Sequence, residues 1–314
     1  RRRIDKGQWA DSTAQALAAA KSLIGSRGFD GLDLAMEILT WCRKHPKGIR
    51  PYIQDVLDVL SEDPEKWDSA GRERWIKSGG SAAGNDSLSR CLIVGLFFQN
   101  DLNRMMDSTV RACQITNYDP RCVEAALALN FVLMQCLKKK VDKDTARHTR
   151  DFIQSFQDSD LYFKDVLNFL PEDLSPYQNF TPYMAYEGDE DSVLDALQAI
   201  DRLRYRDLRS SRGAVASMQL AIWTVIHAEN YADAVRKVVL LGGNSDTQGA
   251  LAGALAGARF GLSSIPQQWI AAVQDRAMLQ AEGELLVDLA EQIIDRDFQE
   301  GRRGLTQEVP RFLP

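Results

Sequence analysis

The segment from Gly242 to Gly261, GGNSDTQGALAGALAGARFG, constrains the fold of this chain more than any other stretch. Its later glycines, Gly249, Gly253, Gly257 and Gly261, recur every fourth residue, so on a helix they form one stripe without side chains. Each interior glycine lowers helix stability by roughly 1 kcal/mol relative to alanine. The pattern therefore predicts close approach of another backbone or of a ligand, and tight helix packing in a crowded core explains the stripe best.

The start of this predicted helix carries more polar side chains than a helix cap needs. Asn244, Ser245, Asp246 and Thr247 follow a Gly-Gly turn, at the point where the free N–H groups and the positive end of the helix dipole emerge. One N-cap residue satisfies a helix start. The additional carboxylate and hydroxyl groups indicate a second role.

A similar start occurs near the other end of the chain. Asp11, Ser12 and Thr13 precede a helix with apolar residues at helical spacing, which Gly25 and Gly28 close. Taken singly, each start is best interpreted as a helix cap. Together they predict two helix starts that meet at one oxygen-lined site, because carboxylates and hydroxyls are the groups that hard divalent cations bind.

Composition frames this hypothesis. The 314 residues are 45% hydrophobic, enough for one large core, and nothing in the chain requires a division into two domains. The net charge of −6 argues against a nucleic-acid partner or an anionic membrane, since no basic stripe offsets the acidic residues. Five cysteines without a C-x-x-C pair, and no apolar run judged long enough to span a bilayer, favour a cytoplasmic protein.

Helical periodicity dominates and convincing alternating strands are absent, so we predict a compact all-α fold. The segment between Leu170 and Asp191 is long for a loop in a helical bundle and is typical of a functional lid or an insert. The predicted helices cover residues 12–24, 31–44, 50–60, 87–99, 102–114, 119–138, 143–156, 190–201, 213–227, 230–239, 247–259 and 278–297.

Four segments in the same order resemble the motifs of the ADP-ribosylglycohydrolase family. The run LGGNSDTQGALAGALAGARFGLSSIPQQW resembles its G-G-D-x-D-T turn, small-residue helix and I-P-x-x-W end. WADST is similar to its W-T-D-D-T, GGSAAGNDSLSR to its G-x-G-N-G-S-x-x-R loop, and ITNYDPRCVEAA to its T-H-x-D-P helix start. The resemblance extends from Trp9 to Trp269. It implies an orthogonal α-helical bundle, as one domain over 1–314, with the site in a cleft near the first and last motifs.

The resemblance also implies a chemistry. Enzymes of this family hold two magnesium ions between the T-D-D and D-x-D-T turns and hydrolyse the bond between ADP-ribose and a protein side chain. Magnesium suits this reaction because it is an oxygen-seeking Lewis acid that can orient ribose hydroxyls and water. By position, the implied metal ligands are Asp11, Ser12, Asn244, Asp246 and Thr247, with Asp11 and Asp246 as catalytic candidates. The implied substrate-binding residues are Gly84, Asn85, Asp86 and Ser87 in the diphosphate loop, and Asn117, where the family usually has histidine.

Departures from the family pattern concern the same site. Ser12 and Asn244 stand where the family has aspartate and Ala10 where it has threonine, so two metal-site charges are gone. We therefore expect one weakly bound magnesium at most. Asp86 stands at a glycine position, where a carboxylate repels a diphosphate unless it points away or meets a cation. The family's N-terminal G-D-A-x-G segment does not occur in this sequence.

Two functions follow from these observations. The first is a hydrolase that releases ADP-ribose from protein side chains or related conjugates through a reduced magnesium site. The second is a catalytically impaired relative that keeps the fold and binds ADP-ribose without turnover. Retention of Asp11, Asp246 and Thr247 favours the hydrolase, and the loss of two carboxylates favours the impaired relative. Neither a G-x-S-x-G elbow nor an H-E-x-x-H helix appears.

Overall fold

The computed structural model describes residues 5–44, 49–80, 82–159 and 192–299. These residues form helices and contain no strand, apart from one isolated antiparallel bridge between Gly84 and Gly213. The α-helices are α1 (Asp11–Ser26), α2 (Gly31–Lys44), α3 (Pro51–Glu62), α4 (Ala70–Lys77), α5 (Leu88–Phe97), α6 (Leu102–Gln114), α7 (Pro120–Leu137), α8 (Thr145–Gln157), α10 (Val193–Ala199), α11 (Ala214–His227), α12 (Tyr231–Leu240), α13 (Ser245–Phe260), α14 (Gln267–Ala272) and α15 (Arg276–Gln299).

The all-α prediction is confirmed, and the predicted helices agree with the observed ones to within a few residues. Four short 3₁₀ helices, at Pro64–Asp68, Ile200–Arg202, Tyr205–Asp207 and Leu262–Ser264, together with α4 and α14, complete the described elements. The helices α4 and α14 were missed because they have only 8 and 6 residues, too few for a clear apolar period. The predicted lid between Leu170 and Asp191 lies outside the described residues.

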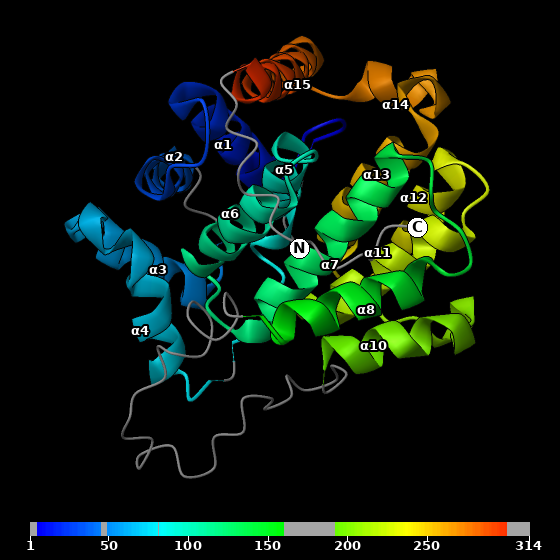
Figure 1. Ribbon diagram of the computed structural model, residues 1–314, viewed down its shortest axis with the longest axis horizontal. Helices are drawn as coiled ribbons and strands as arrows, with labels where there is room; N and C mark the ends of the chain where they lie inside the picture. Colours follow the sequence, from blue (N-terminus) through cyan, green and yellow to red (C-terminus); the bar gives the residue numbers. More distant parts are fainter. Residues whose placement is uncertain (1–4, 45–48, 81, 160–191, 300–314) are drawn as a thin grey trace.

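The centre of the fold is α7, whose residues from Pro120 to Cys136 are all buried. Figure 1 shows α7 in the middle of the bundle, with α5 and α1 on one side and α11, α13 and α12 on the other. Asp119 caps α7 by accepting a hydrogen bond from the Arg121 amide, and Pro120 occupies its first turn.

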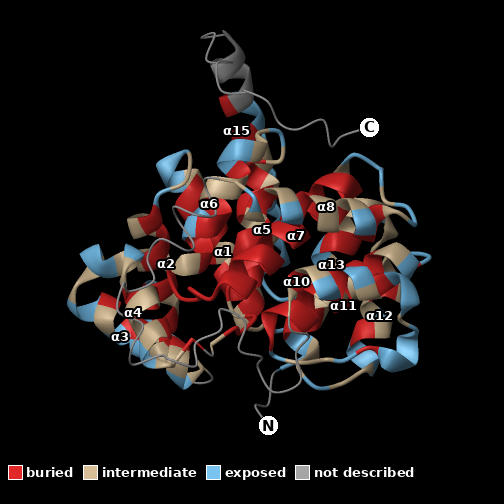
Figure 2. Cartoon of the chain, turned by 60° about the horizontal axis from the view of Figure 1, so that its bottom comes forward, coloured by how far each residue is buried: buried red, intermediate tan, exposed pale blue. Residues whose placement is uncertain are grey.

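An 18-residue window of α7 has a mean hydropathy of 1.2, which corrects the expectation that no apolar run is long enough to span a bilayer. However, 94% of this window is buried inside the protein. Figure 2 likewise shows buried residues concentrated in the inner helices and exposed residues on outer ones such as α12 and α15. The apolar character of α7 is thus accounted for by its central position in the core.

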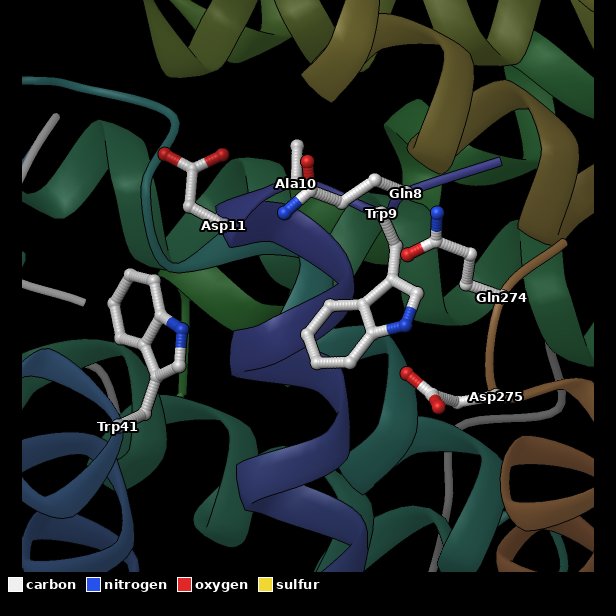
Figure 3. A pocket seen from close by; sticks show the side chains of 7 residues that line it. All are labelled: Gln8, Trp9, Ala10, Asp11, Trp41, Gln274 and Asp275. Atoms are coloured by element: carbon white, nitrogen blue, oxygen red, sulfur yellow. The ribbon is translucent and has the colours of Figure 1, made fainter. Parts of the chain in front are cut away.

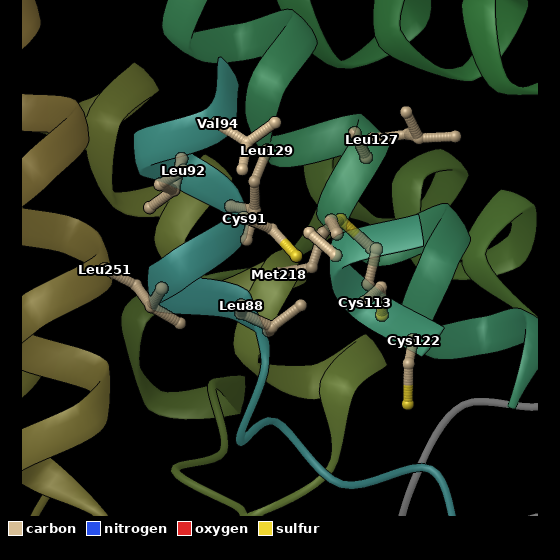
Figure 4. Packing of buried hydrophobic residues seen from close by; sticks show 14 of the residues in the cluster. Leu88, Cys91, Leu92, Val94, Cys113, Cys122, Leu127, Leu129, Met218 and Leu251 are labelled. Atoms are coloured by element: carbon tan, nitrogen blue, oxygen red, sulfur yellow. The ribbon is translucent and has the colours of Figure 1, made fainter. Parts of the chain in front are cut away.

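The core between α5, α6, α7, α11 and α13 contains thiols as well as aliphatic side chains. Cys91, Cys113 and Cys122 are fully buried among residues such as Leu88, Leu129, Met218 and Leu251 (Figure 4). All five cysteines of the chain are buried and free. Burial raises the pKa of Cys91 and Cys122 above the ordinary thiol value. These two cysteines therefore act as small apolar residues of the core.

The glycine stripe of α13 packs against α12, but its glycines are half-buried, so it does not lie in the crowded core that the sequence predicted. A Cβ added at Gly253 would lie 3.4 Å from the Tyr231 hydroxyl oxygen and 3.8 Å from a Val235 methyl carbon. The nearest atom to Gly249 is a Val239 methyl carbon at 3.6 Å. These neighbours are side chains, so the stripe faces the side chains of α12 rather than another backbone, and each site has room for one methyl group.

The end of α1 differs from the sequence prediction. Gly25 lies inside the helix, and Arg27 rather than a glycine takes the left-handed cap conformation, with φ of 51°. The amides of Arg27 and Gly28 donate to carbonyls of the last turn of α1, which compensates for an arginine in this conformation. The helix nevertheless closes at the predicted place.

Candidate functional site

The predicted meeting of the two helix starts is present in the structure. The Ser12 hydroxyl donates to the Thr247 hydroxyl oxygen over 3.1 Å, although 235 positions separate the two residues. Both side chains are buried, with 6% and 7% of their surface exposed. Direct packing of α1 on α13 brings these residues together, and both helices also pack on α5. The polar starts of α1 and α13 therefore lie next to each other.

The acidic residues at these starts do not act as N-caps. The N-cap residues are Ala10 and Asn244, and neither makes a side-chain cap hydrogen bond. Asp11 accepts from the Ser12 amide, and Asp246 accepts from the Thr247 amide in the same way. Asp11 is half-buried and Asp246 exposed, so solvent or a ligand can reach both. The simple helix-cap interpretation therefore leaves these carboxylates unexplained.

Asn244 has a buried atom without a partner. Its amide nitrogen makes no hydrogen bond, although it lies beneath the surface. Rotation of the amide by 180° exchanges its nitrogen and oxygen positions and presents an oxygen at the same point. Asn244 is the N-cap residue directly before Ser245 and Asp246, and an amide oxygen at this helix start is a group that a hard cation can bind.

The number of carboxylates at the helix starts limits this suitability. Among the described residues, no group of three or more His, Cys, Asp or Glu side chains is placed to hold a metal ion. Asp11 and Asp246 are the two carboxylates at the paired starts, as expected from the sequence. A cation here would need water or substrate oxygens to complete its shell, which magnesium accepts.

The segment that resembles a diphosphate loop lies at the start of α5. Asn85 and Ser87 are fully buried, and the Asn85 amide donates to the Arg212 carbonyl oxygen over 2.9 Å. The Asn85 side chain donates to the Ser217 hydroxyl at 2.8 Å. Ser87 lies 3.3 Å from the Cys113 sulfur. These side chains hold the loop against α11 and α6.

Asp86 meets a cation, one of the two conditions under which a carboxylate is compatible with a diphosphate loop. Its carboxylate oxygen lies 2.8 Å from the Nε of Arg50, and the same guanidinium donates to the Asn85 amide oxygen at 2.6 Å. Burial raises the pKa of Asp86 above its ordinary value, and the charge of Arg50 opposes that rise. Arg50 thus neutralises the additional charge of the loop.

A buried chain of hydrogen bonds connects the loop to the start of α13. The Ser217 hydroxyl accepts from Asn85 and also from the Gln248 amide at 2.7 Å. Gln248 follows Thr247 directly and donates to the Ser211 carbonyl as well. This chain of hydrogen bonds fixes the loop at Asn85 relative to the paired helix starts.

Asn117 is buried beneath the loop at Gly84 and Asn85 and holds its backbone by a hydrogen bond. It is 1% exposed, and its amide nitrogen donates to the Gly84 carbonyl oxygen at 3.1 Å. Its amide oxygen accepts from the Thr116 hydroxyl at 2.7 Å. Both ends of the side chain are therefore engaged inside the protein, and a ligand contact by Asn117 stays a prediction.

A pocket of about 140 Å³ opens beside the start of α1. Figure 3 shows the indoles of Trp9 and Trp41 in this pocket and the Asp275 carboxylate beside the Trp9 ring. The complete lining comprises Gln8, Trp9, Ala10, Asp11, Trp41, Gln274 and Asp275. Asp11 belongs both to this pocket and to the paired helix starts, so the pocket adjoins the predicted site.

Sequence reasoning missed several residues of this region. Arg50 precedes α3 in a stretch without a recognisable motif. The one sequence feature that could have indicated its role is its charge, which is opposite to that of Asp86. Ser217 and Gln248 resemble ordinary helix residues in the sequence. Asp275 follows the last motif, and its position against Trp9 depends on contacts between distant segments.

Comparison with known proteins identifies the arrangement. The family model described as ADP-ribosylglycohydrolase matches residues 1–303 of this chain. The chain belongs to the ADP-ribosylglycohydrolase family. A solved structure titled "ADP-ribosylglycohydrolase-related protein complex" shares the fold, with a TM-score of 0.65, 24% identity, and coverage of 90% of this chain and 82% of its own.

The curated relatives of this chain are distant in sequence. ADP-ribosylarginine hydrolase Tri1 of Serratia proteamaculans is 22% identical over 93% of this chain and 68% of its own length. ADP-ribosyl-[dinitrogen reductase] glycohydrolase of Rhodospirillum rubrum is 22% identical over 85% of this chain and 74% of its own. Human ADP-ribosylhydrolase ARH3 is 24% identical over 93% and 79%. These names agree on the hydrolysis of ADP-ribosyl bonds and differ in the substrate.

Proposed function

We propose that this ADP-ribosylglycohydrolase releases ADP-ribose from a modified protein side chain or a related conjugate, assisted by one magnesium ion. The observation that carries the proposal is the 3.1 Å contact between Ser12 and Thr247, with Asp11 and Asp246 at the same two helix starts. Oxygen groups held at one point by two helices can place a reacting bond and water in a fixed relative geometry, which accelerates hydrolysis.

Magnesium would be held by Asp11 and Asp246, with Ser12, Asn244 and Thr247 as neutral oxygen ligands. When bound, it would supply a Lewis acid that polarises oxygen and lowers the pKa of water. The protein itself contributes the placement: the hydrogen-bond chain from Asn85 through Ser217 to Gln248 holds the diphosphate loop at a defined position relative to these ligands. Arg50 removes the repulsion that Asp86 would exert on a diphosphate.

A second function has its own support. The absence of a cluster of three or more acidic or metal-binding side chains among the described residues favours a relative that binds ADP-ribose without turnover. Neutral Ser12 and Asn244 stand where two carboxylates would strengthen the metal site.

Release of free ADP-ribose from arginine- and serine-linked conjugates distinguishes the two functions. The proposal expects magnesium-dependent release by the natural protein and its loss in Asp246→Ala. An exposed residue such as Asp246 is replaceable without loss of the fold, and a melting curve checks this. Asp58→Ala, on the exposed face of α3, is a matched control that keeps activity. Binding of ADP-ribose without its release from any conjugate would contradict the hydrolase proposal and support the second function.

A further inference from the structure

The residues between α10 and α11 carry a local excess of positive charge. This basic segment, residues 200–213, contains five arginines and two aspartates in a chain whose net charge is −6. All five arginines are exposed. They are Arg202, Arg204, Arg206, Arg209 and Arg212. The acidity of the chain as a whole therefore does not extend to this segment.

Most of these arginines have no acidic partner inside the protein. The Arg206 Nε lies 3.8 Å from the Asp207 carboxylate, which also accepts a hydrogen bond from the Arg204 backbone amide. Within the described part of the chain, the guanidinium groups of the other four arginines form no ion pair. A guanidinium matches the geometry of a carboxylate with two parallel hydrogen bonds. The basic segment thus presents cations with which carboxylates of another molecule can pair.

Contacts with α11 and α12 hold the basic segment in place. The Trp223 indole N–H donates to the Leu203 carbonyl oxygen at 3.1 Å, and the Tyr205 hydroxyl donates to the Lys237 carbonyl oxygen at 2.8 Å. Leu208, near the middle of the segment, is buried. Because these contacts fix the backbone that carries the arginines, less conformational entropy is lost when a partner binds to them.

The end of the basic segment adjoins the candidate site. The Arg212 carbonyl oxygen accepts from the Asn85 amide, and the Ser211 carbonyl oxygen accepts from the Gln248 side chain, each over 2.9 Å. Asn85 belongs to the loop that resembles a diphosphate site, and Gln248 belongs to the first turn of α13. A protein whose modified side chain enters this site would therefore lie close to the basic segment.

The surface beside the basic segment is partly apolar, which indicates the kind of partner. Tyr205 is 39% exposed, and Val239 and Leu240 at the end of α12 are 47% and 79% exposed. Arginine and tyrosine are enriched at protein interfaces. A nucleic acid or an anionic membrane would bring many negative charges toward a protein of net charge −6, whereas a short acidic peptide brings few. The charges and the apolar side chains together favour a protein partner.

We propose that the basic segment binds an acidic stretch of the ADP-ribosylated protein and thereby directs the modified side chain to the paired helix starts. The identity of the partner rests on the proposed function, but the binding itself needs no reaction. Carboxylates of the partner pair with the exposed guanidinium groups, and an apolar side chain next to them covers Leu240. The enzyme therefore prefers modified residues that have acidic neighbours.

Peptide binding tests the surface in the absence of turnover. Fluorescence anisotropy compares a labelled polyglutamate peptide, a polyglutamine peptide of equal length and a single-stranded oligonucleotide of equal charge. We expect the polyglutamate peptide to bind most tightly, and added salt to weaken its binding. The double variant Arg204→Gln with Arg209→Gln should lower this affinity about fivefold, because each exposed ion pair contributes little.

A matched control removes the same charge at another place. Lys21→Gln with Arg104→Gln, at exposed positions of α1 and α6, should leave polyglutamate binding unchanged. Melting curves check that both double variants fold. Equal losses of affinity in the two double variants would overturn the proposal, because the effect would then come from net charge alone. Tighter binding of the oligonucleotide than of polyglutamate would overturn it as well.

Peptide conjugates relate the surface to the reaction. The ratio of kcat/KM for conjugates with acidic over neutral residues beside the ADP-ribosylated side chain should fall toward one in the Arg204→Gln, Arg209→Gln variant, and the control should keep it. An unchanged ratio in an active protein would reject the docking surface and leave the hydrolase proposal intact. Polyglutamate binding that depends on Arg204 and Arg209, in a protein that releases no ADP-ribose, would support the surface and reject the hydrolase.

Discussion

The Arg50 guanidinium and the Asp86 carboxylate form an ion pair of 2.8 Å within the loop that resembles a diphosphate site. Arg50 precedes α3 and Asp86 precedes α5, so the pair joins two elements. The Arg50 and Asp86 side chains are 23% and 13% exposed. The same guanidinium also donates a hydrogen bond to the Asn85 amide oxygen. Removal of the cation therefore leaves a poorly solvated carboxylate and an amide oxygen without their donor.

Arg50→Leu should lower the free energy of unfolding by about 1 to 3 kcal/mol, the usual cost of leaving a poorly solvated polar group unpaired. Asp86→Asn in the same chain should recover part of that loss, because the unpaired charge is then gone. Denaturant unfolding of the two single variants and the double variant measures the coupling. Strictly additive effects would show that the ion pair contributes nothing.

Asp86 also predicts a pH dependence. Its pKa is raised above 3.8 in the folded protein, chiefly by burial, so the folded state binds more protons than the unfolded state between 3.8 and the raised value. Stability should therefore fall as pH increases through this window, relative to an Asp86→Asn variant that cannot titrate there. Denaturant unfolding from about pH 4 to about pH 8 tests this difference. A difference that grows in the opposite direction would mean that Arg50 outweighs burial.

Magnesium should bind weakly, with a stoichiometry of about one per chain, because two carboxylates rather than four stand at the paired helix starts. Calorimetric titration of the metal-free protein measures affinity and stoichiometry together. Two tight sites would contradict the charge argument. Complete absence of binding would favour the relative that binds ADP-ribose without turnover.

The double change Ser12→Asp with Asn244→Asp should raise magnesium affinity, since it restores a carboxylate at each helix start. The empty variant should be less stable than the natural protein, because like charges are then crowded together. Calorimetry and thermal melting, each with and without magnesium, check both expectations. Activity that appears only in the double variant would identify a metal-impaired relative. Inactivity of both proteins would place the defect at another residue, such as Asp86 or Asn117.

Gly253 provides a test of the glycine stripe with a matched control. Gly253→Leu should destabilise the protein by about 1 to 3 kcal/mol, because the added carbons must displace Tyr231 or Val235 of α12. Gly253→Ala should instead be neutral or stabilising by up to about 1 kcal/mol, since its Cβ meets the Tyr231 hydroxyl oxygen at 3.4 Å and alanine favours the helix. Thermal melting compares the two. An unchanged melting temperature in Gly253→Leu would show that the α12 contact is loose.

Local sequence determined most of the helices and the identity of the polar residues at their starts. Helical periodicity depends on residues within a few positions of one another. It therefore predicts long helices such as α1 and α13 correctly but does not detect short helices such as α4 and α14. The motif order also identified the family. The positions of Asp11, Ser12, Asp246 and Thr247 at two helix starts followed directly from this local information.

Only the tertiary structure decided which of these groups meet. The contact of Ser12 with Thr247 depends on the packing of α1 against α13. The neutralisation of Asp86 depends on the position of Arg50 before α3, and the pocket of Trp9 and Asp275 depends on the approach of Gly7 to Gln274. Each of these three contacts joins segments that are far apart in the chain. Its geometry depends on the packing of the whole core, so no local sequence pattern predicts it.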